Sequence, residues 1–460
     1  MTVRQTRFEV MFSRVLVANR GEVAVRVIRT LHDMGIEAVA VYSTADENSM
    51  HVRMADRAVR IGPPPAAESY LRIPSLIAAA GTTRCDAIHP GWGFLAENPA
   101  FVRAAEENDL VFIGPSADVM ARMGDKIEAK EEMAAADVPT VPGTEQLSAL
   151  AEAREASDDI GYPVLLKAAA GGGGKGMRLV SSADELEAAF RNAAAEAGAA
   201  FGDERIYLEK ALVPARHVEV QVLCDADGGV LTLGERECSI QRRHQKLVEE
   251  SPSPALSERT REEMEAAAAR ACTAIGYRNA GTFEFLLGPE SFYFIELNAR
   301  LQVEHPFSEL CTGLDIVREQ IRIAAGERVA ATGRAERRGH AIEVRINAED
   351  PASDFAPSPG RVERFSPPLG PGVRVDTYLE NGAHVPSFYD SLVAKVIVWD
   401  EDRPGAVARS LRALRELDVH GIATTRGLAI EILRSEEFGS GRYSTDFLER
   451  RVPRREQAEV

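Results

Sequence analysis

Cysteine is scarce in this sequence and follows no recognisable spacing. Its five cysteines are Cys85, Cys224, Cys238, Cys272 and Cys311. No two of them form a Cys-x-x-Cys or another metal-ligand pattern, and an odd number cannot pair completely within one chain. These features argue against a disulfide-stabilised secreted scaffold and a cysteine-bound zinc site, and they predict a reduced, cytoplasmic protein.

Long apolar runs and an excess of basic charge are also missing. No run approaches the roughly 20 apolar residues of a membrane-spanning helix, and residues 1–14 lack the apolar core of a signal peptide. We read residues 1–10 as a loose extension, with Met11 as an alternative start. The formal net charge of −17 argues against a nucleic-acid surface, so an anionic ligand would have to meet a local cluster of Lys and Arg. We expect no membrane partner and no nucleic-acid partner.

The N-terminal part has the pattern of a parallel α/β domain. A short apolar run begins at Arg14, a helix with apolar residues at helical spacing follows, and a second apolar run covers residues 38–41. A strand, a helix and a strand in that length predict a Rossmann-like βαβ unit. The first turn, residues 19–22 (Asn-Arg-Gly-Glu), lacks the G-x-G-x-x-G pattern, so we expect no dinucleotide there.

A later loop of the same domain is a candidate ligand site. Residues 87–98 read as a strand end that breaks into a Gly- and Pro-rich loop containing His89 and Trp92. Ligands of α/β folds bind at the ends of parallel strands. A tight turn with a packed Trp92 explains the same residues equally well.

Four consecutive glycines mark the middle of the chain. Residues 171–176 (Gly-Gly-Gly-Gly-Lys-Gly) lie between two apolar runs, which predicts a loop joining two strands. A P-loop would end in Gly-Lys-Ser or Gly-Lys-Thr and open a helix, but Lys175 is followed by Gly176 and another strand. The free N–H groups of such a loop suit a lid over phosphate oxygens, with Lys167 at its base. The alternative is a flexible surface hairpin.

Residues 282–298 have the pattern of an aromatic-rich β-hairpin. If Gly288 pairs with Phe292 across the turn, Glu284 lies opposite Glu296 on one face. Two carboxylates in that position repel each other unless a cation lies between them, and oxygen ligands suit magnesium held together with phosphates. Asn298, two residues further on, would add a neutral oxygen. The alternative is that both glutamates lie on a solvated face.

Two more segments are candidates for nucleotide contacts. The strand predicted over residues 205–212 and its following linker can offer backbone groups to the edge of an adenine ring, with Leu212 as an apolar cover. The basic cluster, residues 241–246 (Gln-Arg-Arg-His-Gln-Lys), is expected in a loop after a strand at residues 230–234. A charge run usually marks a solvated surface, but in so acidic a chain this cluster could also meet phosphate and carbonate oxygens.

The pattern becomes β-rich after residues 331–339, which are small and polar. Residues 341–347 alternate and place Glu343, Arg345 and Asn347 on one face. Arg345 suits either a structural ion pair or a catalytic role. The expected fold class is α/β, with a Rossmann-like N-terminal domain over residues 11–124, a central domain over 125–330 with a glycine-rich lid at about 140–212, and an α+β C-terminal domain with an antiparallel sheet over 331–452.

The order of these motifs resembles that of the ATP-grasp enzymes and, more narrowly, of the biotin carboxylases. The resemblance covers nearly all of residues 14–450 and rests on residues 18–22, 89–95, 123–126, 171–176, 242–246, 281–285, 302–306 and 345–351. Trp92 stands where the family often has Tyr, and Lys175 where it often has Arg. Residues 445–446 (Thr-Asp) differ from what some relatives place beside the adenine.

The resemblance implies a role for each candidate residue. The ATP-binding residues would be Lys126, Lys167, Gly171, Gly172, Gly173, Gly174, Glu209, Lys210, Leu212, His217, Gln241, His244, Glu284 and Glu296. Glu284 and Glu296, assisted by Asn298, would hold Mg²⁺ or Mn²⁺. Bicarbonate would be bound by Lys246, Arg300, Gln302, Val303 and Glu304, with Lys246 and Arg300 taking part in catalysis. Glu304 would be the base, and Arg345 would face the ureido oxygen of biotin.

The implied reaction is the ATP-dependent carboxylation of biotin by bicarbonate through carboxyphosphate, the first half-reaction of acetyl-CoA carboxylase in fatty acid synthesis. The sequence contains no Met-Lys-Met segment to carry biotin and no carboxyltransferase region. We therefore expect a biotin carboxyl carrier protein and carboxyltransferase subunits as separate chains, and the family suggests a homodimer. The alternatives are the same component of a propionyl-CoA, another acyl-CoA or a pyruvate carboxylase, another ATP-grasp ligase that joins a carboxylate to an amine, and a nucleotide-sensing protein without turnover.

Overall fold

The N-terminal part of the chain is a parallel sheet covered by helices. The computed structural model describes residues 12–147, 149–169, 177–288 and 291–451. The first elements are β1 (Arg14–Val17), α1 (Gly21–Asp33), β2 (Glu37–Ser43), α2 (Met50–Met54), β3 (Arg57–Gly62), α3 (Ile73–Thr83), β4 (Ala87–His89), α4 (Pro99–Glu106), β5 (Val111–Phe112) and α5 (Ala117–Gly124). The strands are hydrogen-bonded in the order β3-β2-β1-β4-β5 and every pair is parallel. The predicted βαβ unit is confirmed.

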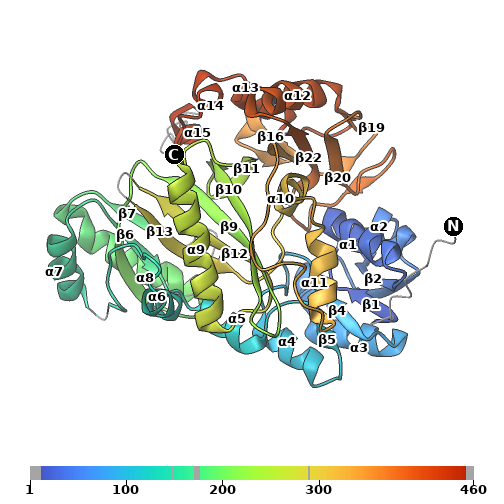
Figure 1. Ribbon diagram of the computed structural model, residues 1–460, viewed down its shortest axis with the longest axis horizontal. Coiled ribbons are helices and arrows are strands. Elements are labelled where there is room, and N and C mark those ends of the chain that lie inside the picture. The colour runs from blue at the N-terminus through green and yellow to red at the C-terminus, as the bar shows by residue number, and fades with distance from the viewer. Residues whose placement is uncertain (1–11, 148, 170–176, 289–290, 452–460) are drawn as a thin grey trace, which may run out of the picture.

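A smaller sheet forms the lobe at the left of Figure 1. Its elements are α6 (Lys126–Ala135), α7 (Leu150–Ile160), β6 (Val164–Ala168), β7 (Arg178–Val180), α8 (Ala183–Phe201) and β8 (Ile206–Lys210), with strand order β7-β6-β8. The Asp125 side chain caps α6 by accepting hydrogen bonds from the N–H groups of Ile127 and Glu128. The strands that flank the glycine loop are also confirmed, while the loop itself, with Gly171, Gly172, Gly173 and Gly174, lies outside the described residues.

A long mixed sheet occupies the centre of the molecule (Figure 1). Its first part contains β9 (Arg216–Cys224), β10 (Val230–Arg242), β11 (Gln245–Ser251), α9 (Glu258–Ile275), β12 (Asn279–Leu287), β13 (Phe292–Asn298), α10 (His305–Thr312), α11 (Ile316–Ala324) and β14 (Gly333–Arg334). Ser257 caps the start of α9, and Gly276 ends it in the left-handed conformation. The apolar side of α9 packs on the sheet through Met264, Ala268 and Cys272.

The C-terminal part continues this central sheet. Its elements are β15 (His340–Asn347), β16 (Glu349–Asp350), β17 (Ala356–Pro357), β18 (Gly360–Arg361), β19 (Arg364–Ser366), β20 (Val373–Thr377), β21 (His384–Val385), β22 (Leu392–Asp400), α12 (Arg403–Glu416), β23 (Asp418–His420), α13 (Arg426–Leu433), α14 (Glu436–Gly439) and α15 (Phe447–Arg451). The order is β13-β12-β9-β10-β11-β15-β22-β20, and β14 pairs with β10. The expected C-terminal antiparallel sheet is therefore present, but it is not separate. Its strand β15 pairs with β11, so the C-terminal strands continue the central sheet and cover what would otherwise be a free strand edge.

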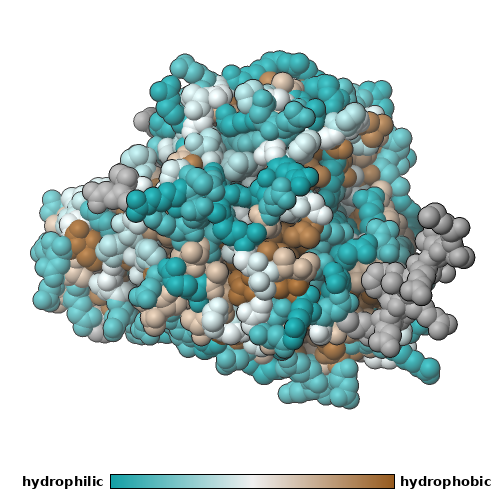
Figure 2. Space-filling view, in the orientation of Figure 1, coloured by the Kyte–Doolittle hydropathy of each residue, from teal (hydrophilic) through white to brown (hydrophobic). Residues whose placement is uncertain are grey.

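One face of the molecule is mainly polar. On the face seen in Figure 2, hydrophilic residues predominate and hydrophobic residues form small separate areas. Within the described ranges, no helix combines the length and apolar character needed to cross a membrane.

Candidate active site

The two predicted carboxylates lie opposite each other on the β12–β13 hairpin. Glu284 pairs in register with Glu296, and Thr282 pairs with Asn298. The predicted turn register is wrong, because Phe292 pairs with Leu287 rather than with Gly288. An irregularity in the ladder between Glu284 and Phe285 compensates for this shift. Glu284 is only 4% exposed and the Glu296 side chain 33% exposed, so Glu284 at least does not lie on a solvated face.

A buried lysine connects three carboxylates at the centre of the site. Lys246 Nζ lies 2.9 Å from Glu284 Oε1 and 2.7 Å from Glu304 Oε1, and it also bonds to Glu219. Burial alone would lower the pKa of Lys246, but the three carboxylates outweigh it and raise this pKa well above the usual value. Lys246 therefore carries a full positive charge where bicarbonate, an anion, is expected to bind.

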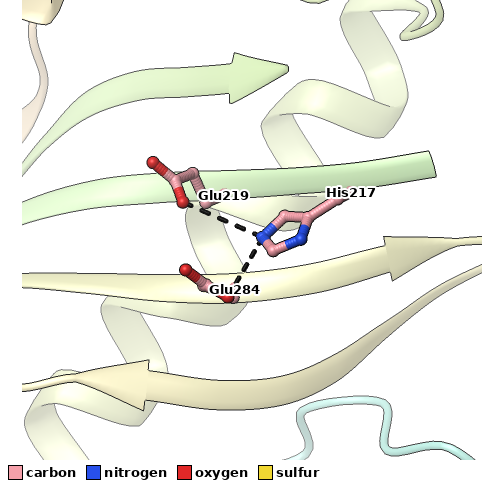
Figure 3. A group of neighbouring side chains, drawn as sticks. All are labelled: His217, Glu219 and Glu284. Atoms are coloured by element: carbon pink, nitrogen blue, oxygen red, sulfur yellow. Dashed lines mark ion pairs between the residues drawn. The ribbon is translucent and has the colours of Figure 1, made fainter. Parts of the chain in front are cut away.

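His217 lies beside the same group of carboxylates (Figure 3). Its Nε2 atom is 3.0 Å from Glu284 Oε2 and 3.9 Å from Glu219 Oε2. Burial would lower the pKa of His217, but Glu284 outweighs it and raises the pKa. Burial would likewise raise the pKa of Glu284, but Lys246 and His217 outweigh burial and hold this pKa well below the usual range. Glu284 is thus ionised at neutral pH.

The residues predicted for magnesium fit a divalent cation. Burial and the repulsion from Glu284 raise the pKa of Glu296, and Lys126, with Nζ 3.8 Å from Glu296 Oε2, only partly offsets this. Where two carboxylates face each other and the pKa of one is raised, a bound cation would stabilise the ionised form of both. Asn298 donates from Nδ2 to Glu284 Oε1 at 2.9 Å. The oxygen donors of these residues are those that Mg²⁺ prefers.

The segment after β13 carries the residues predicted to hold bicarbonate. Arg300 donates to Asn298 Oδ1 at 2.9 Å and to Gln302 Oε1 at 3.2 Å, and its Nε bonds to Glu97 at 2.8 Å. Gln302 Nε2 is buried and has no hydrogen-bond partner among the described residues. A buried donor without a partner costs free energy, and a bound oxyanion would remove that cost.

Glu304 is held between two cations. Its Oε2 accepts a hydrogen bond from Arg345 at 2.9 Å, while Oε1 accepts one from Lys246. Burial would raise the pKa of Glu304, but Lys246 and Arg345 outweigh it and hold the pKa well below the usual range. Arg345 Nε also donates to Glu249 Oε1 at 2.6 Å. Arg345 thus lies directly beside the predicted base, in contact with two carboxylates.

The two predicted phosphate-binding lysines lie at the start of α6 (Lys126) and on β6 (Lys167). Burial lowers the pKa of Lys126 although Glu296 opposes this. Lys167 and Lys130 both bond to the buried Glu209 and together outweigh burial, so that the pKa of Glu209 is lowered. Lys210 instead donates to the carbonyl oxygens of Gly161 and Tyr162 at 2.9 and 3.1 Å. Two of the predicted ATP residues, Lys167 and Glu209, are therefore already paired with each other.

The basic cluster is a hairpin tip and not a loop after a shorter strand. β10 extends to Arg242 and β11 begins at Gln245, with Arg243 and His244 in the turn at φ values of 48° and 66°. Gln241 Nε2 lies 2.9 Å from His217 Nδ1, which places these two predicted adenosine residues together. Arg242 and Arg243 bond to Asp354, so they bind a loop of the C-terminal part.

Two sequence motifs without an assigned role, residues 18–22 and 89–95, contact each other, and Lys395 connects them to the segment predicted to bind bicarbonate. Trp92 Nε1 donates to Glu22 Oε1 at 3.0 Å, and the fully buried Lys395 lies 3.1 Å from Glu22 Oε2. Lys395 also donates to the carbonyl oxygen of Val303 at 2.8 Å. Trp92 is therefore a packed turn residue. Its ring nitrogen holds Glu22, which pairs with Lys395, and Lys395 in turn bonds to Val303.

Comparison with known proteins is consistent with this geometry. The family model "Biotin carboxylase, N-terminal domain" matches residues 11–120, "Carbamoyl-phosphate synthase L chain, ATP binding domain" matches 125–332, and "Biotin carboxylase C-terminal domain" matches 343–450. The biotin carboxylase of Nostoc sp. is 52% identical over 441 residues, which cover 95% of this chain and 99% of that protein. The chain belongs to the biotin carboxylase family.

Two further relatives come from enzymes with other names. One of the chains of the pyruvate carboxylase of Methanothermobacter thermautotrophicus is 50% identical over 95% of this chain and 90% of its own length. The biotin carboxylase domain dimer of the 2-oxoglutarate carboxylase of Hydrogenobacter thermophilus, solved with MgADP, ADP and bicarbonate, superposes with a TM-score of 0.92. It is 47% identical and the match covers 96% of this chain and 98% of that one. Membership of the biotin carboxylase family is thus compatible with several final acceptors.

Sequence reasoning missed several charged residues of this biotin carboxylase site. They are Glu22, Glu97, Lys130, Glu219, Arg236, Glu249 and Lys395. Glu219 had a usable signal, because the alternation of β9 places it on the same face as His217. Arg236, fully buried, holds Glu219 with Nε and donates to Gln221 and Thr282 at 2.6 and 2.9 Å.

Two of the departures from the family pattern, Trp92 and Thr445, lie in the described part of the chain and contact other segments there. Trp92 still reaches Glu22 with its ring nitrogen. Lys175 lies outside the described residues. Thr445 donates its backbone N–H to the carbonyl oxygen of Ala215 at 3.0 Å, at the start of β9, so the C-terminal tail runs beside the strand that carries His217.

Proposed function

We propose that this chain carboxylates biotin with bicarbonate and ATP and that the residues named above carry the roles expected from the sequence. The observation that carries the proposal is the position of Glu304, which contacts Lys246 through one oxygen and Arg345 through the other. A base between the cation that attracts bicarbonate and the cation that would face biotin suits a reaction in which the same carbon is activated and then transferred.

In the first step Glu304 takes the proton of bicarbonate, and a bicarbonate oxygen attacks the γ-phosphorus of ATP. The bond from that phosphorus to the β–γ bridging oxygen breaks, so that carboxyphosphate and ADP form. Lys246, Arg300 and the unpartnered Gln302 Nε2 orient and stabilise the anion. The low pKa of Glu304 makes it a weak base. Its contact with Lys246 and Arg345, however, places it beside the O–H group of a bicarbonate whose acidity these cations would increase.

Magnesium has a binding place in this scheme. Glu284 and Glu296 would hold it with Asn298 assisting, because the two glutamates lie opposite each other in the ladder of β12 and β13. A bound Mg²⁺ or Mn²⁺ would offset the negative charge of the ATP phosphates during transfer. Lys126 and Lys167 would contribute positive charge from the lid side.

In the second step carboxyphosphate breaks into CO₂ and phosphate, and the phosphate takes the N–H proton of biotin. The biotin nitrogen then attacks CO₂ to give the carbamate. Arg345 would stabilise the negative charge on the ureido oxygen, since its guanidinium already points at the Glu304 carboxylate. Closure of the lid would keep water from hydrolysing the intermediate.

The proposal extends to partners and division of the chain. A separate biotin carrier protein, carboxyltransferase subunits, a homodimer, a cytoplasmic location and the three domains 11–124, 125–330 and 331–452 all belong to it. The matches of the three family models support this division. We propose acetyl-CoA as the final acceptor; propionyl-CoA, another acyl-CoA or pyruvate are the alternatives. Pairing the protein with candidate carrier and transferase chains and comparing these acceptors decides among them.

Phosphate release tests the reaction itself. With ATP and Mg²⁺ present, release should depend on bicarbonate and rise on addition of free biotin. An ATP-grasp ligase that joins a carboxylate to an amine would share the ATP and metal residues but would not respond to biotin. Equal rates with and without biotin would reject the proposal in favour of such a ligase, and absence of turnover would favour a nucleotide-sensing protein.

A further inference from the structure

Four ionisable side chains form one layer on neighbouring strands beside the site. Glu249 on β11 lies opposite Glu343 on β15, and Arg345 on β15 lies opposite Lys395 on β22. Directly opposed residues share a face of the sheet, and so do residues two apart on one strand. The layer therefore contains two acids and two bases, of which the expected site includes Arg345 alone.

Arg345 has two carboxylate partners with different tasks. Glu304 Oε2 accepts from its Nη2 at 2.9 Å. Glu249 Oε1 lies 2.6 Å from Nε and 2.6 Å from Nη2, so one oxygen holds two nitrogen atoms of the guanidinium. Glu249 is fully buried, and in the described part of the chain its other oxygen has no hydrogen-bond partner. Glu249 thus holds Nε of Arg345 and shares Nη2 with Glu304.

The reaction changes the charge of only one of these partners. When Glu304 takes the bicarbonate proton it becomes neutral, and its bond to Arg345 is no longer assisted by opposite charge. Resting on the proposed function, we propose that Glu249 is a positioning residue, which holds the Arg345 guanidinium in place for biotin while Glu304 is protonated. A guanidinium held by Glu304 alone would lose its charged partner at the moment when the ureido oxyanion forms.

The electrostatics of Glu249 agree with this role. Burial raises its pKa, Arg345 lowers it and Glu304 raises it, which leaves the pKa at about 7. Neutralising Glu304 removes one of the influences that keep Glu249 protonated, so Glu249 becomes more strongly ionised when Glu304 loses its charge. The charged and titratable groups that face Glu249 from the surrounding elements are Cys238 on β10, Lys246 on β11, Glu304 before α10, and Glu343 and Arg345 on β15.

Glu343 provides a matched control. It is as buried as Glu249 and lies opposite it in the ladder, yet neither of its oxygens has a hydrogen-bond partner among the described residues. Burial dominates over Lys395 and raises its pKa well above the usual range. Neither Glu343 oxygen has a hydrogen-bond partner in the described part of the chain, so Glu343→Gln removes no hydrogen bond there, whereas Glu249→Gln removes the carboxylate that holds Arg345.

The experiment compares phosphate release with bicarbonate alone and with bicarbonate plus biotin, for the unaltered protein and three variants. We expect Glu249→Gln to lower the biotin-dependent increment at least about tenfold through kcat, with the bicarbonate-dependent rate within about threefold. Glu249→Asp, which keeps the charge, should recover part of the loss. Glu343→Gln should match the unaltered protein in both rates. Circular dichroism and thermal melting check that each variant is folded.

The pH profile separates positioning from general support of the fold. In the unaltered protein the ratio of the biotin-dependent to the biotin-independent rate should rise with pH below about 7 and level off above it, because the ionised Glu249 is needed and the protonation of Glu304 favours that ionisation. In Glu249→Gln this rise should be missing. If that variant does not fold, the ratio in the unaltered protein still decides, since a ratio that is flat across this range contradicts the proposal.

Other outcomes also overturn the inference. Glu249→Gln with a normal biotin increment, an equal loss of both rates, or the same loss in Glu343→Gln would each show that Glu249 does not act through Arg345. An unaltered protein that biotin does not stimulate would instead reject the proposed function, and this result is seen before any variant is measured.

Discussion

Replacing Lys395 by methionine should uncouple three parts of the molecule at once. Lys395 is fully buried on β22 and connects Glu22 of the N-terminal part with the carbonyl oxygen of Val303. Methionine keeps the apolar stem and removes the charge. The change leaves Glu22 Oε2 in a buried position without its cation, and breaking a buried ion pair from one side costs about 3–5 kcal/mol. Urea-induced unfolding should show a loss of that size.

A double-mutant cycle with Glu22→Gln separates the pair from its surroundings. Glutamine can still accept the hydrogen bond from Trp92, but it has no charge to leave unpaired. The double variant Lys395→Met/Glu22→Gln should therefore be more stable than Lys395→Met by about 2 kcal/mol. A double variant that is no more stable than Lys395→Met, or a single variant that loses less than about 1 kcal/mol, would refute the reasoning.

The stability of the single variant Lys395→Met should depend on pH in a predictable direction. Burial already raises the pKa of Glu22, and Lys395 opposes that rise, so Lys395→Met should raise the pKa further. An acid whose pKa is higher in the folded state binds more protons there, and its contribution to stability falls as pH rises. The loss of stability should thus be greater at pH 8 than at pH 5. The variant also loses the hydrogen bond from Lys395 to the carbonyl oxygen of Val303. The KM for bicarbonate, measured by phosphate release, should therefore rise.

Three other perturbations have expected outcomes. Glu304→Gln should lower bicarbonate-dependent phosphate release by about 10²–10⁴-fold, and a change below about tenfold would contradict its role as base. Chelation of divalent ions with EDTA should abolish turnover and added Mg²⁺ or Mn²⁺ should restore it, with Glu296→Gln needing more metal for the half-maximal rate; turnover in EDTA would argue against the metal site. Arg242→Ala should change the free energy of unfolding by no more than about 1–2 kcal/mol, because its partner Asp354 is 79% exposed, and a larger loss in urea unfolding would show that the hairpin tip supports the C-terminal part.

The predictable features were those that a short stretch of sequence encodes. The alternation of β12 and β13 placed Glu284 opposite Glu296, and the strands around the glycine loop followed from the apolar runs on either side of it. The hairpin register was only partly predictable, because an irregularity beside Glu284 shifts the ladder and no residue type announces it. The basic cluster was assigned to a loop because a run of charges hides the strand continuation through Arg242.

Contacts between distant segments could not be predicted from one sequence. Glu22 and Lys395 lie near opposite ends of the chain, and each alone is an ordinary charged residue in an apolar pattern. Glu249 is the middle residue of a Val-Glu-Glu run in β11, and only the pairing of β11 with β15 places it behind Arg345. The shared sheet itself was missed, since the small polar residues 331–339 suggest a boundary, while β15 after them is joined by hydrogen bonds to β11 before them.

Transfer of labelled carbon tests the central claim most directly. The protein is incubated with ATP, Mg²⁺, biotin and ¹⁴C-bicarbonate, and the label in carboxybiotin is compared with the biotin-dependent phosphate released. The account predicts one labelled carboxybiotin for each additional phosphate, with both signals lost in Glu304→Gln. Biotin-stimulated phosphate release without label in biotin, or label that does not require ATP, would contradict it.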